Sequence, residues 1–249
     1  MDVSGRILIM TSLFAHRGHH TRWPENSVAA VAAAREVGAD GVEIDVWQTT
    51  DKSLVVNHDR YFGRHDVTRC SSAQLEATTL ISTLAEVLEA AGELRINVEI
   101  KSTRSAPYNM AVAREVSAFL DASRVSHRCL VSSFSLAICD EVRAVSPTRR
   151  IGWLVTRRRA DFVLDTVSAH SLTSAHLPFS RVSGAVVRRA QDLGIELHVW
   201  TPNLERDLDR MLDLGVGALI TDDVPLARAL RAHHARTTGV LPSSNHDLD

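Results

Sequence analysis

The chain has few cysteines, no long apolar run and almost no net charge. Three cysteines among 249 residues, with no Cys-x-x-Cys pair, exclude a disulfide framework and a structural zinc site. The apolar stretch 7–10 is far too short to span a membrane and short for a signal peptide, so we expect a cytoplasmic protein without an integral membrane segment. A formal net charge of −2 gives no support to nucleic-acid binding.

Short β-branched runs alternate with helical patterns, which predicts βαβ units around a parallel sheet. Asn26-Ser27 is well placed to cap the first helix, and Gly38 stands where a helix-ending glycine belongs. Strands are expected at 13–16, 41–47, 54–57, 95–100, 129–133, 151–155, 175–179, 196–200 and 218–221, and further helices near 84–91, 107–121, 135–145, 161–168, 181–193, 204–214 and 224–234.

Counting 54–57 as an extension of the second strand leaves eight β/α units, the number in a (β/α)8 barrel. We therefore predict an α/β fold, a TIM barrel in a single domain over residues 13–232. Residues 1–12 would be an N-terminal lead-in, and residues 59–94 a short insert region after the second strand. From 233 to 249 the periodicity is lost and Thr, Ser, Gly and Pro increase, so we expect no ordered structure there.

Acidic side chains collect on the second and third barrel strands. Successive side chains of a strand alternate between its faces, so Glu43 and Asp45 point to the same face of the second strand. For the same reason Glu99 and Lys101 point to one face of the third strand, and in a barrel this face can be the interior. Carboxylates that face a barrel interior are costly unless they are paired or bound to a cation. Three of them from adjacent strands form a hard oxygen site suited to Mg²⁺ or Ca²⁺. We therefore expect a divalent cation at Glu43, Asp45 and Glu99.

Two histidines and two cations stand beside these carboxylates at the strand ends. Histidine is the side chain suited to proton transfer near neutral pH, so His16 and His58 could supply an acid and a base. Arg17 and Lys101 would neutralise an anionic substrate, and Arg17 could bind phosphate oxygens bidentately. Each feature alone is more often structural. Their clustering on the first three strands favours a catalytic interpretation.

Eight short motifs follow one another along the chain. They are Ala15-His-Arg-Gly18, Pro24-Glu-Asn-Ser27, Val42-Glu-Ile-Asp45, Val55-Val-Asn-His-Asp59, Val98-Glu-Ile-Lys101, Ser132-Ser-Phe134, Val199-Trp-Thr201 and Ile220-Thr-Asp222. In this order and spacing they resemble the glycerophosphodiester phosphodiesterases, over about residues 13–230. The resemblance implies a TIM barrel that hydrolyses small-molecule glycerophosphodiesters to glycerol 3-phosphate and an alcohol.

The resemblance also implies a role for each matching residue. By position, Glu43, Asp45 and Glu99 would hold a divalent cation, His16 and His58 would be the general acid/base pair, Arg17 and Lys101 would contact the phosphate, and Trp200 would form a wall of the pocket. Which histidine is the acid, which ion is bound, whether water or the glycerol 2-hydroxyl attacks, and the oligomeric state stay open.

Two other functions stay open beside this one. The first is phospholipase-D-like cleavage of a lysophospholipid or sphingolipid on the same fold. Relatives of that kind are typically secreted and disulfide-bonded, and this sequence shows neither an export signal nor their cysteine pattern. The second is a catalytically silent barrel that binds a phosphorylated ligand. It is disfavoured because no expected acid, base or ligand position is substituted.

Several polar residues have a structural interpretation that we prefer over a functional one. Glu25 and Asn26 are expected to be cap and turn residues, and His19 and His20 solvated loop residues. His176, near the end of a weak strand, could reach the pocket.

Two further features bear on which substrates the site accepts: a basic run and the length of the insert. The basic run 157–159 follows the fifth barrel strand and is expected to be solvated, with attraction of anionic substrates as the alternative. The insert after the second strand is short, whereas in many relatives it forms a lobe over the site.

Overall fold

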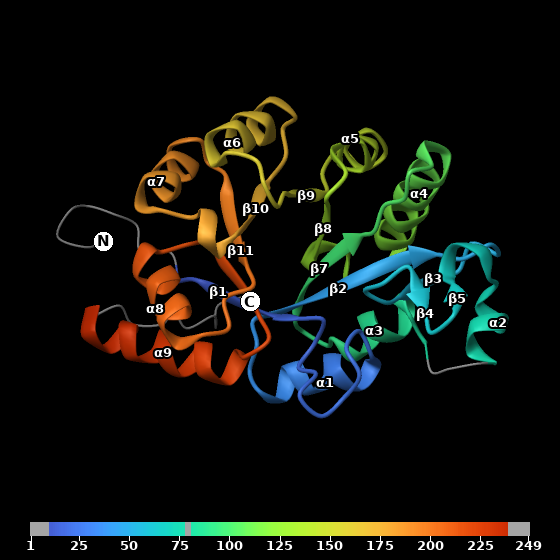
Figure 1. The fold of residues 1–249 in the computed structure, drawn as a ribbon, viewed down its shortest axis with the longest axis horizontal. Helices are drawn as coiled ribbons and strands as arrows, with labels where there is room; N and C mark the ends of the chain where they lie inside the picture. The colour runs from blue at the N-terminus through green and yellow to red at the C-terminus, as the bar shows by residue number, and fades with distance from the viewer. Residues whose placement is uncertain (1–9, 78–80, 239–249) are drawn as a thin grey trace.

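The computed structural model describes residues 10–77 and 81–238, and Figure 1 shows the arrangement of their elements. Eight parallel strands close into a barrel because the first strand pairs with both the second and the last. This confirms the predicted (β/α)8 barrel. The barrel strands are β1 (Ser12–His16), β2 (Gly41–Gln48), β7 (Arg95–Ile100), β8 (Cys129–Ser133), β9 (Arg150–Leu154), β10 (Ser174–Pro178), β11 (Glu196–Trp200) and β12 (Ala218–Thr221).

Helices surround the barrel, as Figure 1 shows. The first begins where expected, because the Ser27 side chain accepts a hydrogen bond from the backbone N–H of Ala30. Gly38 then ends the helical turn with a φ of +73°, in the left-handed region that glycine tolerates. The barrel helices are α1 (Val28–Glu36), α3 (Leu84–Ala90), α4 (Ala106–Ala122), α5 (Leu136–Val145), α6 (Ala160–Ala169), α7 (Gly184–Asp192), α8 (Glu205–Leu214) and α9 (Val224–Thr238).

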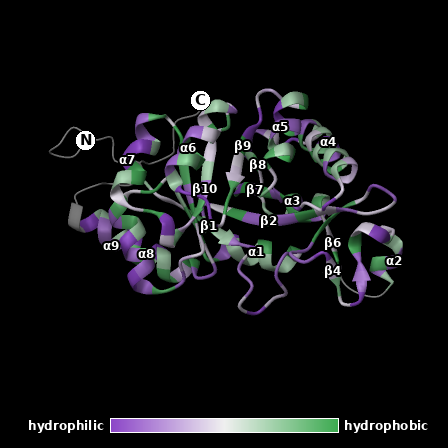
Figure 2. Ribbon diagram, turned by 45° about the horizontal axis from the view of Figure 1, so that its top comes forward, coloured by the Kyte–Doolittle hydropathy of each residue, from purple (hydrophilic) through white to green (hydrophobic). Residues whose placement is uncertain are grey.

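The main hydrophobic core lies between the barrel strands and these helices. Alternate strand residues such as Ile44 and Val98 face outward and are fully buried in it. Burial of apolar surface stabilises such a layer by roughly 25 cal/mol per Å². Helices such as α8 and α9 carry hydrophilic residues as well as hydrophobic ones (Figure 2). The remaining strand residues face the barrel interior, and there many are polar.

The barrel interior holds two buried histidines, His176 on β10 and His198 on β11. The His176 and His198 rings stack with their centroids 4.5 Å apart, and His176 Nε2 lies 2.9 Å from the Ser174 hydroxyl. A Cβ at Gly152 would lie 2.2 Å from His176 Nε2, so glycine leaves the space for this ring. His176 is fully buried and is absent from the lining of both cavities of the active site described below. Its suggested role in the pocket therefore has no support.

The insert region forms a small unit beside the barrel with its own apolar cluster. Residues 54–56 do not prolong the second strand but return antiparallel to it, so that Trp47 lies opposite Val55. Arg60 forms an ion pair with Asp66, which joins the two ends of a short hairpin in this unit. Its elements are β3 (Leu54–Val56), β4 (Tyr61–Phe62), β5 (His65–Asp66), η1 (Val67–Arg69), α2 (Ser72–Glu76) and β6 (Ser82–Thr83).

The last helix is longer than expected. It includes residues 233–238, for which no ordered structure was expected. Its final turns are tied to α8, because His234 Nε2 lies 2.7 Å from an Asp209 carboxylate oxygen. Residues 239–249 of the expected tail lie outside the described residues. Across the part of the chain that is described, no helix is long and apolar enough to cross a membrane.

Candidate active site

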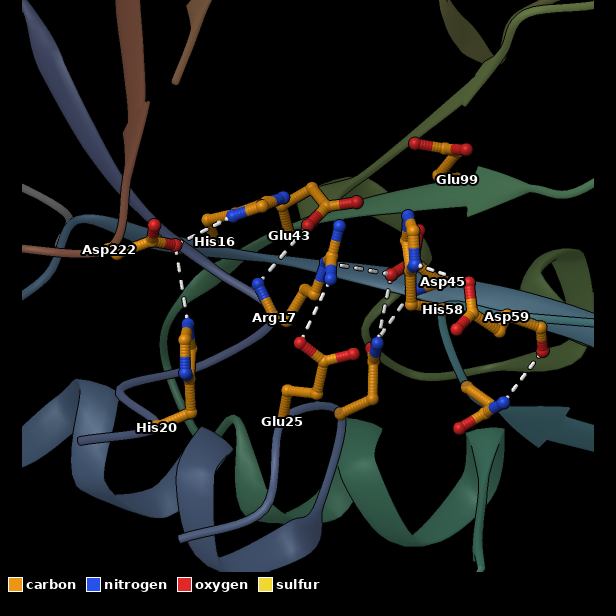
Figure 3. A network of polar contacts seen from close by, with 12 residues as sticks. His16, Arg17, His20, Glu25, Glu43, Asp45, His58, Asp59, Glu99 and Asp222 are labelled. Carbon is orange, nitrogen blue, oxygen red and sulfur yellow. Dashed lines mark hydrogen bonds and ion pairs between the residues drawn. The ribbon is translucent and has the colours of Figure 1, made fainter. Parts of the chain in front are cut away.

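Three carboxylates meet inside the barrel at the carboxyl ends of two neighbouring strands. Glu43 and Asp45 project from β2, and Glu99 projects from β7 (Figure 3). Asp45 and Glu99 are direct partners in the strand register, so their side chains are side by side. One oxygen from each of the three carboxylates lies within 4.8 Å of the others. All three are buried, which places the acidic cluster where the sequence predicts it.

Burial and mutual repulsion shape the charge of this cluster. Burial, followed by the charge of Asp45, raises the pKa of Glu99 to about 7, and the same two causes raise the pKa of Glu43 well above its ordinary value. The Lys101 ammonium lies 2.7 Å from oxygens of both Asp45 and Glu99. Burial disfavours its charged form, but these two carboxylates outweigh burial and raise the pKa of Lys101.

Arg17 closes the cluster from the loop after β1. Its backbone N–H donates to Glu43 at 3.1 Å, and its guanidinium lies 2.9 Å from Glu25 and 3.4 Å from Asp45. The turn is tight: Gly18 has a φ of +83°, and a Cβ there would meet the backbone of Ala30 at 2.6 Å. Because of its contact with the guanidinium, Glu25 is an ion-pair partner of Arg17 as well as a loop residue.

Asn26 positions a carboxylate, and this role differs from the cap or turn that the sequence suggests. Its side chain is buried, and its amide donates to Asp45 Oδ2 at 2.8 Å while its carbonyl accepts from the Asp45 backbone N–H at 3.0 Å. The capping function belongs to Ser27 instead. Asn26 adopts a φ of +57°, which asparagine tolerates better than most residues.

His16 is held by a carboxylate from the far end of the chain. Its Nδ1 lies 2.7 Å from Asp222, which follows β12. Asp222 also contacts His20 Nε2 at 3.2 Å and accepts from the Asn203 amide at 2.5 Å. Burial works against ionisation, but hydrogen bonds from His16, His20 and Asn203 lower the pKa of Asp222. This contact leaves Nε2 of His16 to face the site.

Sequence reasoning missed this support. Asp222 belongs to the motif Ile220-Thr-Asp222, and its position after the last barrel strand was the available signal. His20 was expected to be solvated, but it is partly buried against Asp222. For the other loop histidine, His19, the side-chain Nε2 lies 3.1 Å from the Thr21 hydroxyl, and the backbone N–H donates to the Ala30 carbonyl.

His58 stands across the cluster from His16, at the start of the insert (Figure 3). Its Nδ1 lies 3.0 Å from the carboxylate of the adjacent Asp59, and about a third of its side chain is exposed. Burial and the nearby charge of Lys101 lower the pKa of His58. The two histidines thus flank the carboxylates from different sides.

Two adjoining cavities meet at this cluster, with volumes of about 130 Å³ and about 250 Å³. They share His58, Glu99, Lys101 and Phe134. The smaller, which we call the inner cavity, is otherwise lined by His16, Arg17, Glu43, Asp45, Leu154, Trp200, Thr201 and Ile220. The larger, the outer cavity, is otherwise lined by Trp47, Asp59, Arg60, Ile100 and Ser102.

The expected substrate residues all border the inner cavity. Trp200 forms one wall, and its ring meets Phe134 edge to face with centroids 5.9 Å apart. Arg17 and Lys101 line the cavity while remaining paired with the carboxylates. The basic run 157–159 lies on exposed surface and lines neither cavity.

The donor set fits a hard divalent cation. Glu43, Asp45 and Glu99 offer only oxygen atoms and lie close enough to share one ion. Within the described residues, the side-chain cations that contact the three carboxylates are Lys101 and Arg17, which leaves an excess of negative charge when all three are ionised. A bound divalent cation would remove that excess.

Comparison with known proteins agrees with this geometry. The glycerophosphoryl diester phosphodiesterase family model matches residues 16–226. A glycerophosphodiester phosphodiesterase from Caldanaerobacter subterraneus subsp. tengcongensis is 30% identical in an alignment of 234 residues that covers 86% of this chain and 94% of that protein.

Solved structures share the fold. A glycerophosphodiester phosphodiesterase from Parabacteroides distasonis superposes with a TM-score of 0.84 at 24% identity, covering 91% of this chain and 99% of that one. A phosphodiesterase from Oleispira antarctica, solved in complex with the product sn-glycerol-3-phosphate, gives 0.80 at 20% identity, covering 89% and 96%. With a family model that spans most of its length and a site of matching chemistry, the chain belongs to the glycerophosphoryl diester phosphodiesterase family.

Proposed function

We propose that this protein hydrolyses glycerophosphodiesters to glycerol 3-phosphate and an alcohol, with His16 and His58 as acid and base. Family membership supports the reaction. The observation that carries the catalytic assignment is the placement of the two imidazoles on different sides of one cluster of carboxylates and cations. The product complex of the Oleispira antarctica phosphodiesterase further supports a glycerol phosphate product.

The two cavities suggest how the substrate lies. The phosphate occupies the region bordered by the shared residues His58 and Lys101. The glycerol side enters the small inner cavity against Trp200, and the leaving alcohol lies in the larger outer cavity. This orientation places the part that varies between substrates in the cavity that is larger and lies beside the insert.

The histidines then take different roles. His16 borders the inner cavity but not the outer cavity. Because Asp222 holds Nδ1 of His16, Nε2 removes the proton from the attacking oxygen. As the new phosphorus–oxygen bond forms, the bond to the leaving alcohol breaks. His58 borders both cavities and must be protonated for this step. Its imidazolium gives a proton to that alcohol oxygen.

Charge on the phosphate is shared between fixed groups. Arg17 and Lys101 are held by carboxylates in the lining of the inner cavity, so little reorganisation accompanies the reaction. Glu43, Asp45 and Glu99 would hold Mg²⁺ or Ca²⁺, which supplies Lewis-acid stabilisation of the phosphate charge when bound.

We also propose that the protein works in the cytoplasm. All three cysteines are free thiols, and Cys129 and Cys139 are buried. Free thiols are typical of proteins from a reducing compartment.

The reaction is tested with Mg²⁺, Ca²⁺ or EDTA by following glycerol 3-phosphate release from glycerophosphocholine and glycerophosphoethanolamine, and lysophosphatidic acid release from lysophosphatidylcholine. We expect turnover of the first two with a divalent cation and none with EDTA. His16→Ala and His58→Ala should each abolish it, whereas the exposed His127→Ala serves as a matched control with wild-type rates. No release from any diester under any metal condition would refute the enzyme assignment.

A second substrate separates the two histidines. Glycerophospho-4-nitrophenol has a weakly basic leaving group that needs no protonation. We expect His58→Ala to recover most activity on this diester, because the acid is no longer required, while His16→Ala stays inactive on both. If His16→Ala recovered activity on this diester and His58→Ala stayed inactive, His16 would be the acid and His58 the base.

A further inference from the structure

Exposed apolar side chains gather on one end of the barrel. In the described part of the chain, nine large hydrophobic residues have more than a third of their surface exposed. Six of these lie between the carboxyl end of a barrel strand and the first turn of the barrel helix that follows it. We call five of them, without Val28 (38%), the apolar rim. They are Trp23 (50% exposed), Tyr61 (57%), Phe134 (42%), Phe162 (50%) and Leu204 (55%).

Barrel topology brings these five residues to the catalytic face. Four come from the segments after the barrel strands β1, β8, β9 and β11, and Tyr61 comes from the insert between β2 and α3. In a (β/α)8 barrel the segments that follow the barrel strands emerge at the end that carries the active site. The rim also touches the site itself, because Phe134 lines both cavities. The rim is therefore distributed around the entrance to the substrate site.

Exposed arginines accompany the apolar rim. Arg22 lies beside Trp23, and Arg104 follows β7. The run 157–159 follows β9, and Arg158 lies 5.5 Å over the ring of Phe162. In this run Arg159 has a carboxylate nearby, Asp161 at 3.8 Å. For Arg22, Arg104 and Arg157, no ion pair forms within residues 10–77 and 81–238. We call these five arginines the basic rim.

Aromatic and apolar side chains interspersed with exposed arginines match the chemistry of a bilayer surface. Apolar tips can enter the region between head groups and acyl chains, and Trp and Tyr favour that depth. Arginines are attracted to anionic head groups within a Debye length of the surface. The formal charge of the whole chain is −2, so the exposed arginines of the rim mark a local property of the catalytic face.

We propose that the catalytic face docks on an anionic phospholipid bilayer, with the apolar rim entering the head-group region and the basic rim binding lipid phosphates. The protein would attach peripherally and reversibly, with the entrance of the active site turned toward the lipid. This docking is independent of the acid and base assignments, because it uses residues outside the catalytic groups.

The test is sedimentation of the full chain with vesicles of phosphatidylcholine alone or mixed with phosphatidylglycerol. We expect binding to the mixed vesicles that weakens as salt is raised. Arg157→Gln, Arg158→Gln and Arg159→Gln combined should lower the partition coefficient about a hundredfold, since each arginine near an anionic surface contributes about fivefold. Trp23→Ala, Phe162→Ala and Leu204→Ala combined should lower it at least about tenfold.

Matched controls come from elsewhere on the surface. Val145 and Leu193 are 43% and 40% exposed at the carboxyl ends of α5 and α7, so Val145→Ala with Leu193→Ala should leave binding unchanged. The exposed Arg124, Arg188 and Arg236, changed together to Gln, control for lost charge. Circular dichroism checks that each variant is folded. Phe134 is left intact because it lines the substrate cavities.

Three outcomes would overturn the proposal. They are no binding to the mixed vesicles, equal losses in the rim and control variants, or a wild-type dimer in solution that the rim substitutions dissociate without affecting vesicle binding. Unchanged turnover of glycerophosphocholine by the rim variants, measured in parallel, separates a failure of docking from a failure of the catalytic proposal.

Discussion

At the scale of single residues, two of the proposed site residues are held by partners that line neither cavity. Asn26 binds Asp45 through both its amide and its carbonyl, and Asp222 fixes one nitrogen of His16. Such partners keep reactive atoms within a fraction of an ångström of a working geometry. They also decide the tautomer of a histidine. A carboxylate accepts a hydrogen bond from Nδ1–H, which leaves Nε2 without a proton and able to act as the base.

Asp222→Asn tests this support. The amide can still contact His16, but it no longer favours the tautomer with a proton on Nδ1. We expect kcat to fall about tenfold to hundredfold with a small change in KM, a loss typical of removing a supporting carboxylate. Steady-state kinetics on glycerophosphocholine measures both constants. A wild-type kcat would show that His16 needs no orientation by Asp222.

The adjacent His20 gives a comparison. His20→Ala removes a weaker contact to Asp222, at 3.2 Å against 2.7 Å for His16. It should therefore lower kcat less than Asp222→Asn does.

At the scale of elements, the barrel interior is filled by side chains that leave little freedom to their neighbours. β9 carries Gly152 opposite Ser174 of β10, and the His176 ring takes the space that a larger residue would occupy. Close packing of this kind makes one added methyl group costly.

Gly152→Ala is predicted to destabilise the protein by about 1–3 kcal/mol, because its Cβ would lie 2.2 Å from His176 Nε2 and 2.7 Å from the Ser174 hydroxyl. Urea denaturation gives the change in free energy of unfolding. Gly184→Ala at the start of α7 is the matched control, since its nearest neighbours lie at 3.4 Å and 3.6 Å. It should be neutral or slightly stabilising, and equal effects of the two changes would contradict this view of the interior.

At the scale of the whole molecule, stability depends on pH through the buried histidines. Burial lowers the pKa of His176 well below its ordinary value and also lowers that of His198. Between the folded and unfolded pKa values the unfolded chain binds more protons. Stability contributed by the neutral rings is therefore present above about pH 6.5 and is lost as the pH falls below it.

His176→Asn should flatten this dependence. Each pH unit below about 6.5 costs wild type about 1.4 kcal/mol per such histidine. The loss of unfolding free energy between about pH 7.5 and about pH 5.5 should thus be smaller in the variant by about 1.4 kcal/mol. Denaturation curves at a series of pH values measure it. Parallel curves for the two proteins would mean that His176 titrates alike in both states.

The carboxylate cluster predicts a second global effect. A cation that binds only the folded state stabilises it, by about 2.7 kcal/mol at a hundred times its dissociation constant. We expect Mg²⁺ or Ca²⁺ to raise Tm by roughly 5–10 °C, and EDTA to reverse the shift.

Glu99→Gln should abolish most of that shift, because it removes one of three oxygen donors. Without added cation the variant should be at least as stable as wild type, because repulsion inside the barrel is reduced. Glu93→Gln, at an exposed position, is the control and should keep the full response. A cation-induced shift of equal size in Glu99→Gln would place the ion elsewhere.

The fold class, the order of the strands and the acidic cluster were predictable from the amino-acid sequence. Strand alternation is a local property, so Glu43 with Asp45, and Glu99 on the next parallel strand, could be assigned to one site from spacing alone. The eight strands were expected within a few residues because apolar runs between helical patterns mark them. The motif order then linked the site to a family.

The distant residues that support that site became evident from the folded barrel and not from the sequence. His16 and Asp222 are separated by 206 positions, and the barrel brings them together because the first and last strands are neighbours. No local pattern encodes such a contact, nor the return of residues 54–56 along the second strand or the gathering of exposed rings at one end. These depend on closure of the barrel, which sets distances that the spacing of residues along the chain does not contain.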